Sequence, residues 1–212
     1  MSPAVERLPR GRHGLSREEV ARTQRDRMLL AMVEASARKG YVDTTVADVL
    51  HGAKVSRETF YQQFDSKLAC FLAAFDAAGE LLLAGLAPVV ADWADDGATG
   101  PVDRVERVER FDRVMGAYLD QIADQSAVTR MFLVEVYAAG PDAIARRAAL
   151  QARIVEGLID LLALAPHQRF AAELVVSATS AMVTPLLVAG DTDALRALRT
   201  PLVDALDRLL AA

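Results

Sequence analysis

The sequence contains very little cysteine and histidine. Its 212 residues include one cysteine, Cys70, and three histidines, and a single cysteine excludes an internal disulfide framework. The histidines form neither an HxxxH pair nor the Glu-x-x-His pattern of metal sites in helical bundles, so we expect no bound metal. A Gly-rich phosphate loop and a Gly-x-Ser-x-Gly elbow are also missing, so we expect no cofactor and no enzymatic activity.

Long hydrophobic runs are absent as well. No uninterrupted apolar stretch reaches the ~18 residues that cross a bilayer, and the longest candidates, such as residues 81–90, contain glycine or proline. The N-terminus is polar and rich in arginine, unlike a secretory signal. We therefore expect a cytoplasmic protein that does not associate with a membrane. Hydrophobic residues make up 52% of the chain, which suffices for a sizeable core.

Basic side chains are concentrated at the start of the chain, although the net charge is −5. Residues 1–70 carry 12 Lys and Arg against 9 Asp and Glu, whereas residues 71–212 carry 12 against 20. All three lysines, Lys39, Lys54 and Lys67, lie in the first part. A basic N-terminal third joined to an acidic body is typical of a nucleic-acid-binding module attached to another domain.

Apolar residues recur at helical spacing along most of the chain, and no strand-turn-strand unit is evident. This pattern predicts an all-α fold of about nine helices. Ser16 and Glu19 form a capping box at the first helix, Gly40 is expected to end that helix, and the fourth helix is expected to end before Pro88. The expected helices cover residues 16–39, 45–52, 57–64, 67–86, 102–123, 127–138, 142–164, 167–188 and 193–210.

Two short helices joined by a tight turn stand out among these elements. Thr45 with Asp48 repeats the capping pattern, and Ser56 caps the next helix. Phe60 and Phe64 are four residues apart, so both should face inward. The pattern predicts a helix-turn-helix from Thr45 to Phe64, whose second helix can enter a DNA major groove.

Three segments of this region closely resemble the DNA-binding domain of the TetR family of bacterial regulators. They are GYVDTTV at residues 40–46, AKVSRETFY at 53–61 and FDSK at 64–67, within a resemblance that spans residues 25–75. Lys54 departs from the family pattern, which usually has glycine in this turn, where a positive φ is common.

The resemblance implies an all-α homodimer with three N-terminal DNA-binding helices and a C-terminal helical core that holds an apolar ligand pocket. The last two long helices would form the dimer interface as a four-helix bundle. On this basis we expect a disordered basic arm at residues 1–15, a DNA-binding domain at 16–66 and a ligand-binding and dimerisation domain at 67–212. The arm contains Pro-Arg-Gly-Arg at 9–12, which is similar to minor-groove-binding arms, but a disordered tail is the favoured interpretation.

The motif also implies DNA contacts. Arg57 and Thr59 would face base edges, while Thr45 and Lys67 would contact phosphates. The alternatives are a plain helix cap for Thr45, a solvated face for Arg57 and packing within the small domain for Tyr61. The predicted DNA-binding residues are Thr45, Ser56, Arg57, Thr59, Tyr61, Gln62 and Lys67.

Large apolar and amphipathic side chains on the later helices are candidates for the ligand pocket, although such residues more often form core. These candidates are Trp93, Phe111, Met115, Tyr118, Phe132, Tyr137, Phe170 and Met182. Glu135 lies within an apolar run, where its carboxylate could face a ligand, but we favour an ion pair with Arg130, Arg146 or Arg147. A lone cysteine beside Phe71 is expected in the core.

The sequence thus predicts a ligand-responsive transcriptional regulator. It would be a repressor that binds a palindromic double-stranded DNA operator as a homodimer and is released by a small hydrophobic effector. The alternative is a helical-bundle small-molecule carrier or enzyme that has lost DNA binding.

Overall fold

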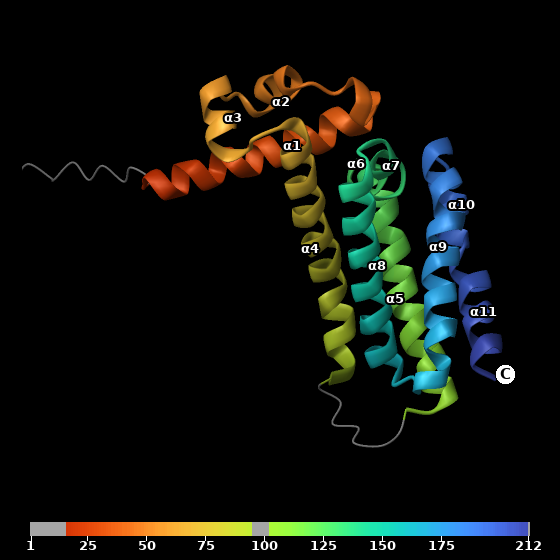
Figure 1. Ribbon diagram of the computed structural model, residues 1–212. Coiled ribbons are helices and arrows are strands. Elements are labelled where there is room, and N and C mark those ends of the chain that lie inside the picture. Colours follow the sequence, from red (N-terminus) through yellow and green to blue (C-terminus); the bar gives the residue numbers. More distant parts are fainter. Residues whose placement is uncertain (1–15, 95–101, 212) are drawn as a thin grey trace, which may run out of the picture.

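The computed structural model describes residues 16–94 and 102–211. Over these ranges every regular element is a helix and no strand occurs, which confirms the predicted all-α fold. Figure 1 shows a small head that lies across one end of an elongated helical bundle, which we call the body. The predicted disordered arm, residues 1–15, lies outside the described residues.

The head consists of the first three helices, and the body contains the others. In the head these are α1 (Arg17–Asp43), α2 (Val46–Ala53) and α3 (Arg57–Gln63). In the body they are α4 (Lys67–Ala94), α5 (Arg104–Asp124), α6 (Ser126–Arg130), a π-helical turn (Met131–Glu135), α7 (Val136–Ala138), α8 (Pro141–Leu162), a 3-10 turn (Pro166–Gln168), α9 (Arg169–Ala189), α10 (Thr192–Ala197) and α11 (Arg199–Ala211).

Side-chain caps begin each of the three head helices, as the sequence predicts. The Glu19 N–H donates to the Ser16 hydroxyl, and the Glu19 carboxylate accepts from the Ser16 N–H. Thr45 and Asp48 form the same reciprocal pair at the start of α2. The Ser56 hydroxyl accepts from a first-turn N–H of α3. These local hydrogen bonds determine where each helix begins.

Two residues with positive φ shape the head. Gly40 has φ 82° and ψ 155°, so the predicted helix end is a kink, and α1 continues for one further turn to Asp43. Lys54 is left-handed, with φ 55° and ψ 50°, at the turn where the TetR resemblance predicts glycine. A left-handed residue with a side chain costs about 1–2 kcal/mol. Arg27 Nη2 donates to the Lys54 carbonyl at 3.2 Å and helps to hold the turn.

Two predicted helix boundaries in the body are wrong. The sequence predicts that the fourth helix ends before Pro88, but α4 continues through this proline. Apolar side chains on both sides of it line the body cavity, so packing outweighs the one backbone hydrogen bond that proline removes. The predicted helix over residues 193–210 is divided at Leu198 into α10 and α11. Pro201 lies in the first turn of α11, where no N–H is needed, so it favours a new helix start.

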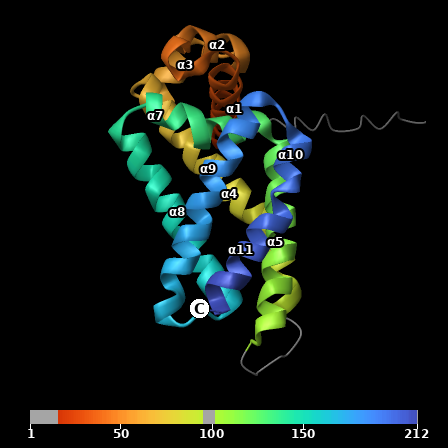
Figure 2. The same ribbon diagram turned by 90° about the vertical axis from the view of Figure 1, so that its right-hand side faces the viewer.

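One contiguous core joins the head to the body. On α4, Phe71 packs edge-on against Tyr41 of the head, and Phe75 packs edge-on against Phe132 of the body, each with ring centroids 4.7 Å apart. Cys70, also on α4, is fully buried, which confirms its predicted core position, and burial raises the pKa of its thiol to about 12. Helix α4 is therefore one mechanical link between the two parts, as the views in Figure 1 and Figure 2 show.

Two body helices are long and apolar enough to cross a membrane by composition alone, and they cover residues 67–91 and 166–189. Both carry part of the core on one side. Phe71 and Phe75 of α4 and Val175 and Val183 of α9 are buried. Core packing accounts for the apolar character of this side of each helix.

Candidate DNA-binding head and body cavity

Helix α3 turns one side to the core and the other to solvent. Phe60 and Phe64 are buried, as predicted, whereas Arg57 and Gln62 are exposed and Tyr61 keeps 48% of its surface exposed. The aromatic ring of Tyr61 still touches the core, because it packs edge-on against Phe60 at 5.4 Å. The structure thus leaves Arg57, Tyr61 and Gln62 exposed on α3, whereas Thr59, two residues from Arg57 and therefore nearly opposite to it around the helix, is half-buried.

Hydrogen bonds between neighbouring side chains order this surface. The Thr59 hydroxyl lies 2.9 Å from the Ser56 hydroxyl and is half-buried. Gln62 donates to Glu58 at 3.4 Å across one helical turn. Arg57 has no side-chain hydrogen bond or ion pair with any other residue that the structure describes. It is therefore the cation on α3 that is available to a base or phosphate.

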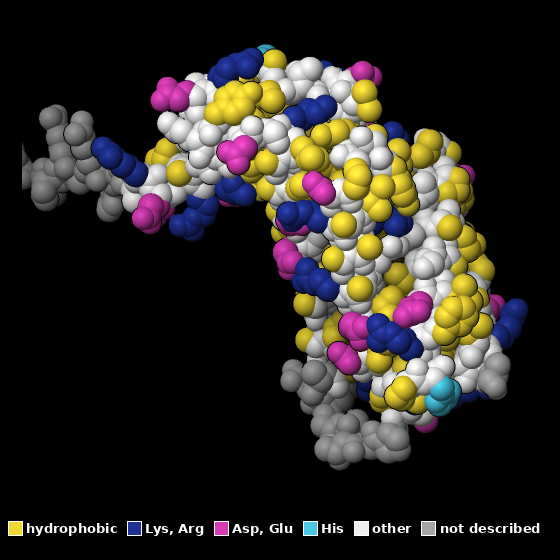
Figure 3. All heavy atoms as spheres, viewed as in Figure 1, with side chains coloured by type: hydrophobic (Ala, Val, Ile, Leu, Met, Phe, Trp, Pro, Cys, Tyr) yellow, Lys and Arg dark blue, Asp and Glu magenta, His cyan; other side chains and the backbone are white. Residues whose placement is uncertain are grey.

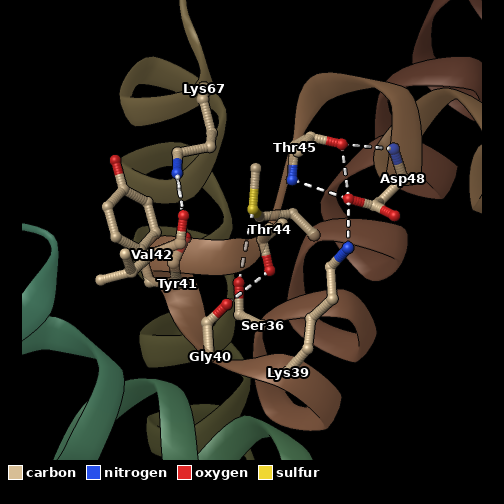
Figure 4. Close-up of polar contacts among 10 residues, drawn as sticks. Ser36, Lys39, Gly40, Tyr41, Val42, Thr44, Thr45, Asp48 and Lys67 are labelled. Atoms are coloured by element: carbon tan, nitrogen blue, oxygen red, sulfur yellow. Dashed lines mark hydrogen bonds and ion pairs between the residues drawn. The ribbon is translucent and has the colours of Figure 1, made fainter.

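The start of α2 already contains an anion. The Thr45 N–H donates to Asp48 Oδ2 at 2.7 Å, and Lys39 Nζ lies 2.6 Å from the same oxygen (Figure 4). The Lys39 ammonium, followed by the two Thr45 donors, holds the pKa of Asp48 well below its usual range. The Thr45 hydroxyl and N–H, which the sequence suggested for a phosphate, are therefore engaged within the capping box.

Lys67 also makes contacts inside the protein. Its Nζ donates to the carbonyl oxygens of Tyr41 at 2.9 Å and of Val42 at 3.3 Å, and it lies 4.1 Å from the centre of the Tyr41 ring (Figure 4). An ammonium has three donors, so one N–H remains for a phosphate. The two carbonyls belong to the last turn of α1, so Lys67 fastens the start of α4 to the end of α1.

A buried carboxylate joins the head to the body. Glu135 lies at the end of the π-helical turn with 5% of its surface exposed. Its Oε2 accepts from the Tyr41 N–H at 2.7 Å, and its Oε1 lies 3.5 Å from Arg130 Nη2. The ion pair confirms one of the predicted partners, whereas the contact with Tyr41 was not foreseen. That contact follows the Gly40 kink, which turns the next N–H towards the body.

The body contains a partly open cavity of about 430 Å³ between α4, α5, α8 and α9. Of the predicted pocket residues, Phe111, Met115 and Tyr118 line it. Tyr118 and Phe132 also line a second, smaller cavity of about 40 Å³. A cavity bounded by apolar residues from four helices is a typical small-molecule site.

The other four predicted pocket residues lie outside the walls of both cavities. Trp93 stacks beneath the Arg113 guanidinium at 4.7 Å, and Tyr137 beside Arg147 at 5.4 Å. Phe170 and Met182 are exposed on α9 by 70% and 41%. Helical spacing shows which residues share a face, but it does not show which neighbour covers that face.

Sequence reasoning missed the smaller residues of the cavity wall. Searching for aromatic residues and methionine overlooks the positions where a short side chain leaves space. An alanine or glycine aligned with leucine or valine on one helical face was the available signal. The wall residues missed in this way include Leu83, Ala87, Ala91, Gly157, Leu158 and Val176.

Comparison with known proteins agrees with this architecture. Residues 29–74 match the family model described as bacterial regulatory proteins, tetR family. No curated protein sequence matches the chain. Among solved structures, the fatty acid degradation regulator FadR from Bacillus halodurans is 17% identical, with a TM-score of 0.69 over 87% of this chain and 94% of that chain.

Two further solved structures share the fold over most of their length. A TetR-like regulator from Rhodococcus sp. RHA1 is 20% identical, with a TM-score of 0.63 over 90% of this chain and 96% of that chain. FadR from Bacillus subtilis in complex with stearoyl-CoA is 15% identical, with a TM-score of 0.61 over 85% and 96%. Residues 29–74 therefore match the domain described for the tetR family of bacterial regulatory proteins, and the chain shares the all-helical fold of solved TetR-family regulators.

Proposed function

We propose that the chain is a homodimeric, cytoplasmic repressor that binds a palindromic operator through α3 of each subunit and leaves it when a small apolar effector binds the body. The observation that carries this proposal is the exposed side of α3. Its start is held by the Ser56 cap, its inner side is locked by Phe60 and Phe64, and Arg57, Tyr61 and Gln62 are exposed and can meet a groove. A rigid helix with an unpacked polar side is what base readout requires.

Phosphate contacts would flank α3. The first-turn N–H groups of α2 at Val46 and Ala47 have no backbone partner in the part of the chain that the structure describes. They can donate to a phosphate oxygen, because Lys39 offsets the negative charge of Asp48 beside them. Thr45 and Lys67 would add the hydrogen bonds that their contacts within the protein leave available. Ser56 and Thr59 would contact the duplex from the start of α3.

An apolar stripe on α9 supports the homodimer. Phe170, Leu174, Met182 and Val188 are exposed at spacings that fall on one side of the helix. Figure 2 faces this part of the body, and Figure 3 shows hydrophobic side chains gathered along α9. Helices α8 and α9 have 22 and 21 residues and pack side by side, so they are the long pair that we propose for the predicted four-helix bundle.

The effector would occupy the body cavity. Its walls are mainly leucine, valine, alanine and aromatic residues, so the bound molecule would be largely apolar. The solved complex of FadR from Bacillus subtilis contains stearoyl-CoA, a molecule with a long apolar chain, in a protein of the same fold. This supports a hydrophobic effector for the present chain.

Selection from genomic DNA fragments, followed by gel shift at low salt, tests the DNA-binding proposal. We expect a palindromic site, and we expect Arg57→Ala and Tyr61→Ala to weaken binding by about 5- to 100-fold each, the effect of losing a base or backbone contact. Arg208→Ala, an exposed arginine on α11, is the matched control and should bind normally. Failure of the unaltered protein to bind any palindrome would contradict the proposal.

Sedimentation tests the dimer. Phe170→Glu combined with Leu174→Glu should convert a dimer to a folded monomer, because two charges would have to be buried in the interface. Val105→Glu places a charge at an equally exposed apolar residue on α5 and should leave the dimer intact. A monomer in the unaltered protein, or dissociation by the control, would argue against the α9 interface.

Native mass spectrometry with a cell extract separates the regulator from the carrier or enzyme that the sequence left open. A captured small molecule that weakens DNA binding supports the regulator. A captured molecule that is converted to a product, in a protein that binds no DNA, supports the alternative.

A further inference from the structure

Two arginines on α8 point to opposite surroundings. Arg146 lies on the outer side and forms an ion pair with Asp76 of α4. The next residue, Arg147, lines the smaller cavity. Arg153, which lines the larger cavity, is neutralised by two hydrogen bonds to Glu80. Within residues 16–94 and 102–211, no carboxylate forms an ion pair with Arg147. Of the two arginines that line the cavities, Arg153 therefore has a carboxylate partner and Arg147 has none among the described residues.

The Arg147 guanidinium is held in place although it lacks a counterion. Its Nε donates to the Phe132 carbonyl at 3.2 Å, and Nη1 donates to Gln151 Oε1 at 3.0 Å. Gln151 in turn donates to the Ser180 hydroxyl at 3.3 Å. A half-buried charge that is oriented by neutral groups and not neutralised is poised to bind an anion.

Tyr118 completes this polar wall. It lines both cavities, and its hydroxyl has no hydrogen-bond partner among the residues that the structure describes. Burial raises the pKa of Tyr118 to about 12, with a smaller opposite effect from the Arg147 charge, so the phenol stays protonated and can donate. Gln151, Ile154 and Ser180 are likewise shared by the two cavities, so this wall lies where they meet.

We propose that the effector is an amphiphilic carboxylate whose apolar body fills the larger cavity and whose carboxylate binds Arg147 and Tyr118 at the smaller one. The inference rests on the effector site proposed above and deepens it. The volumes favour this assignment, because a space of about 40 Å³ suits a carboxylate and not a bulky headgroup, whereas about 430 Å³ suits a hydrocarbon body. An Arg donating two N–H groups to a carboxylate adds orientation as well as affinity.

Direct binding to the complete protein tests the inference. Straight-chain acids from hexanoic to hexadecanoic acid would be compared by calorimetry with the primary alcohol and the methyl ester of the same chain. We expect the preferred acid to bind at least about tenfold more tightly than its alcohol or ester, since a hydrogen bond to a charged group has this magnitude. Equal binding of the three forms, or binding by none of the acids, would overturn the inference.

Variants assign the preference to the proposed residues. Arg147→Met should reduce acid affinity by about 10- to 100-fold and leave alcohol affinity unchanged. Arg146→Met is the matched control, because it removes an adjacent arginine whose partner is the exposed Asp76. Tyr118→Phe removes one hydroxyl without changing the packing volume, so it remains informative if Arg147→Met does not fold. An acid preference that survives Tyr118→Phe and Arg147→Met would overturn the assignment.

Gel shift on the same samples keeps this inference separate from the proposed function. An acid that binds with the expected preference in a protein that binds no DNA would contradict the regulator and leave the carboxylate site standing. DNA binding without any acid binding would contradict the carboxylate site and leave the regulator standing.

Discussion

The head and the body of this protein place side chains by different means. In the head, helix starts at Ser16, Thr45 and Ser56 are set by hydrogen bonds that span three residues. In the body, the walls of the cavity come from α4, α5, α8 and α9, which are far apart in the sequence. The head thus presents a surface determined by local bonds, whereas the body encloses a space determined by distant packing.

Two glycines, Gly52 in the head and Gly157 in the body, have different surroundings. A Cβ added to Gly52 of α2 would lie 2.9 Å from the Ala31 Cβ on α1, which is closer than real contacts allow. A Cβ added to Gly157 of α8, an exposed residue that also lines the cavity, would meet nothing within 4 Å. The α1–α2 contact at Gly52 is therefore tight, whereas the α8 face at Gly157 leaves room for a side chain. The following predictions test that contrast, from the largest effect to the smallest.

Removing the contact between the head and the body should give the largest change in the free energy of unfolding. Glu135→Ala leaves the Tyr41 N–H and the Arg130 guanidinium without their partner, and we expect it to lower the free energy of unfolding by about 2–3 kcal/mol. Chemical denaturation measures this, and Glu156→Ala, an exposed glutamate paired with Arg169, is the control with a much smaller effect. Similar changes in both variants would show that the buried link does not join the parts energetically.

Alanine at Gly52 should destabilise the head. The clash with Ala31 involves a side chain that cannot move aside, so α2 must shift on α1. We expect a loss of about 1–2 kcal/mol in unfolding free energy, even though alanine favours a helix. DNA affinity should fall in the same variant because α2 supports α3. Unchanged stability would mean that the head is less closely packed than the structure indicates.

The same substitution at Gly157 should have the opposite sign. Alanine adds helix propensity within α8 and meets no neighbour, so we expect a gain of about 0.5–1 kcal/mol. Paired thermal melts of the Gly52→Ala and Gly157→Ala proteins compare the two sites directly. If both substitutions shift the melting temperature in the same direction, packing density does not distinguish head from body.

Acid should weaken the start of α2 by a small amount. The pKa of Asp48 is held below the ordinary value of 3.8 by Lys39 and Thr45, so its contribution to stability is complete above that value. The contribution is lost as the pH falls through the range below 3.8, where the unfolded chain takes up the proton first. Comparing denaturation of the unaltered protein and Asp48→Asn between neutral and acidic pH measures this. The variant should show the shallower dependence; an equal dependence would exclude a role for Asp48.

Much of the head could be read from the sequence because its determinants are local. The caps, the inward-facing phenylalanines and the left-handed turn at Lys54 each involve residues within one or two helical turns. The functions assigned to Thr45 and Lys67 were less secure. Their donors are engaged by Asp48 and by the last turn of α1, and only the folded arrangement shows this.

By itself, the sequence determined the helical class of the residues that the structure describes, the helix-turn-helix from Thr45 to Phe64 and the basic character of the N-terminal third. Periodicity, caps and turn residues depend on neighbours close in the sequence, so they can be recognised without the tertiary structure. Tertiary structure alone decided which apolar residues line the cavity and which stay exposed on α9. It also decided that the carboxylate of Glu135 joins the head to the body. Arg130, Arg146 and Arg147 were equivalent partners for Glu135 in the sequence, but packing gives the first to Glu135, the second to Asp76 and leaves the third without a counterion at a cavity wall.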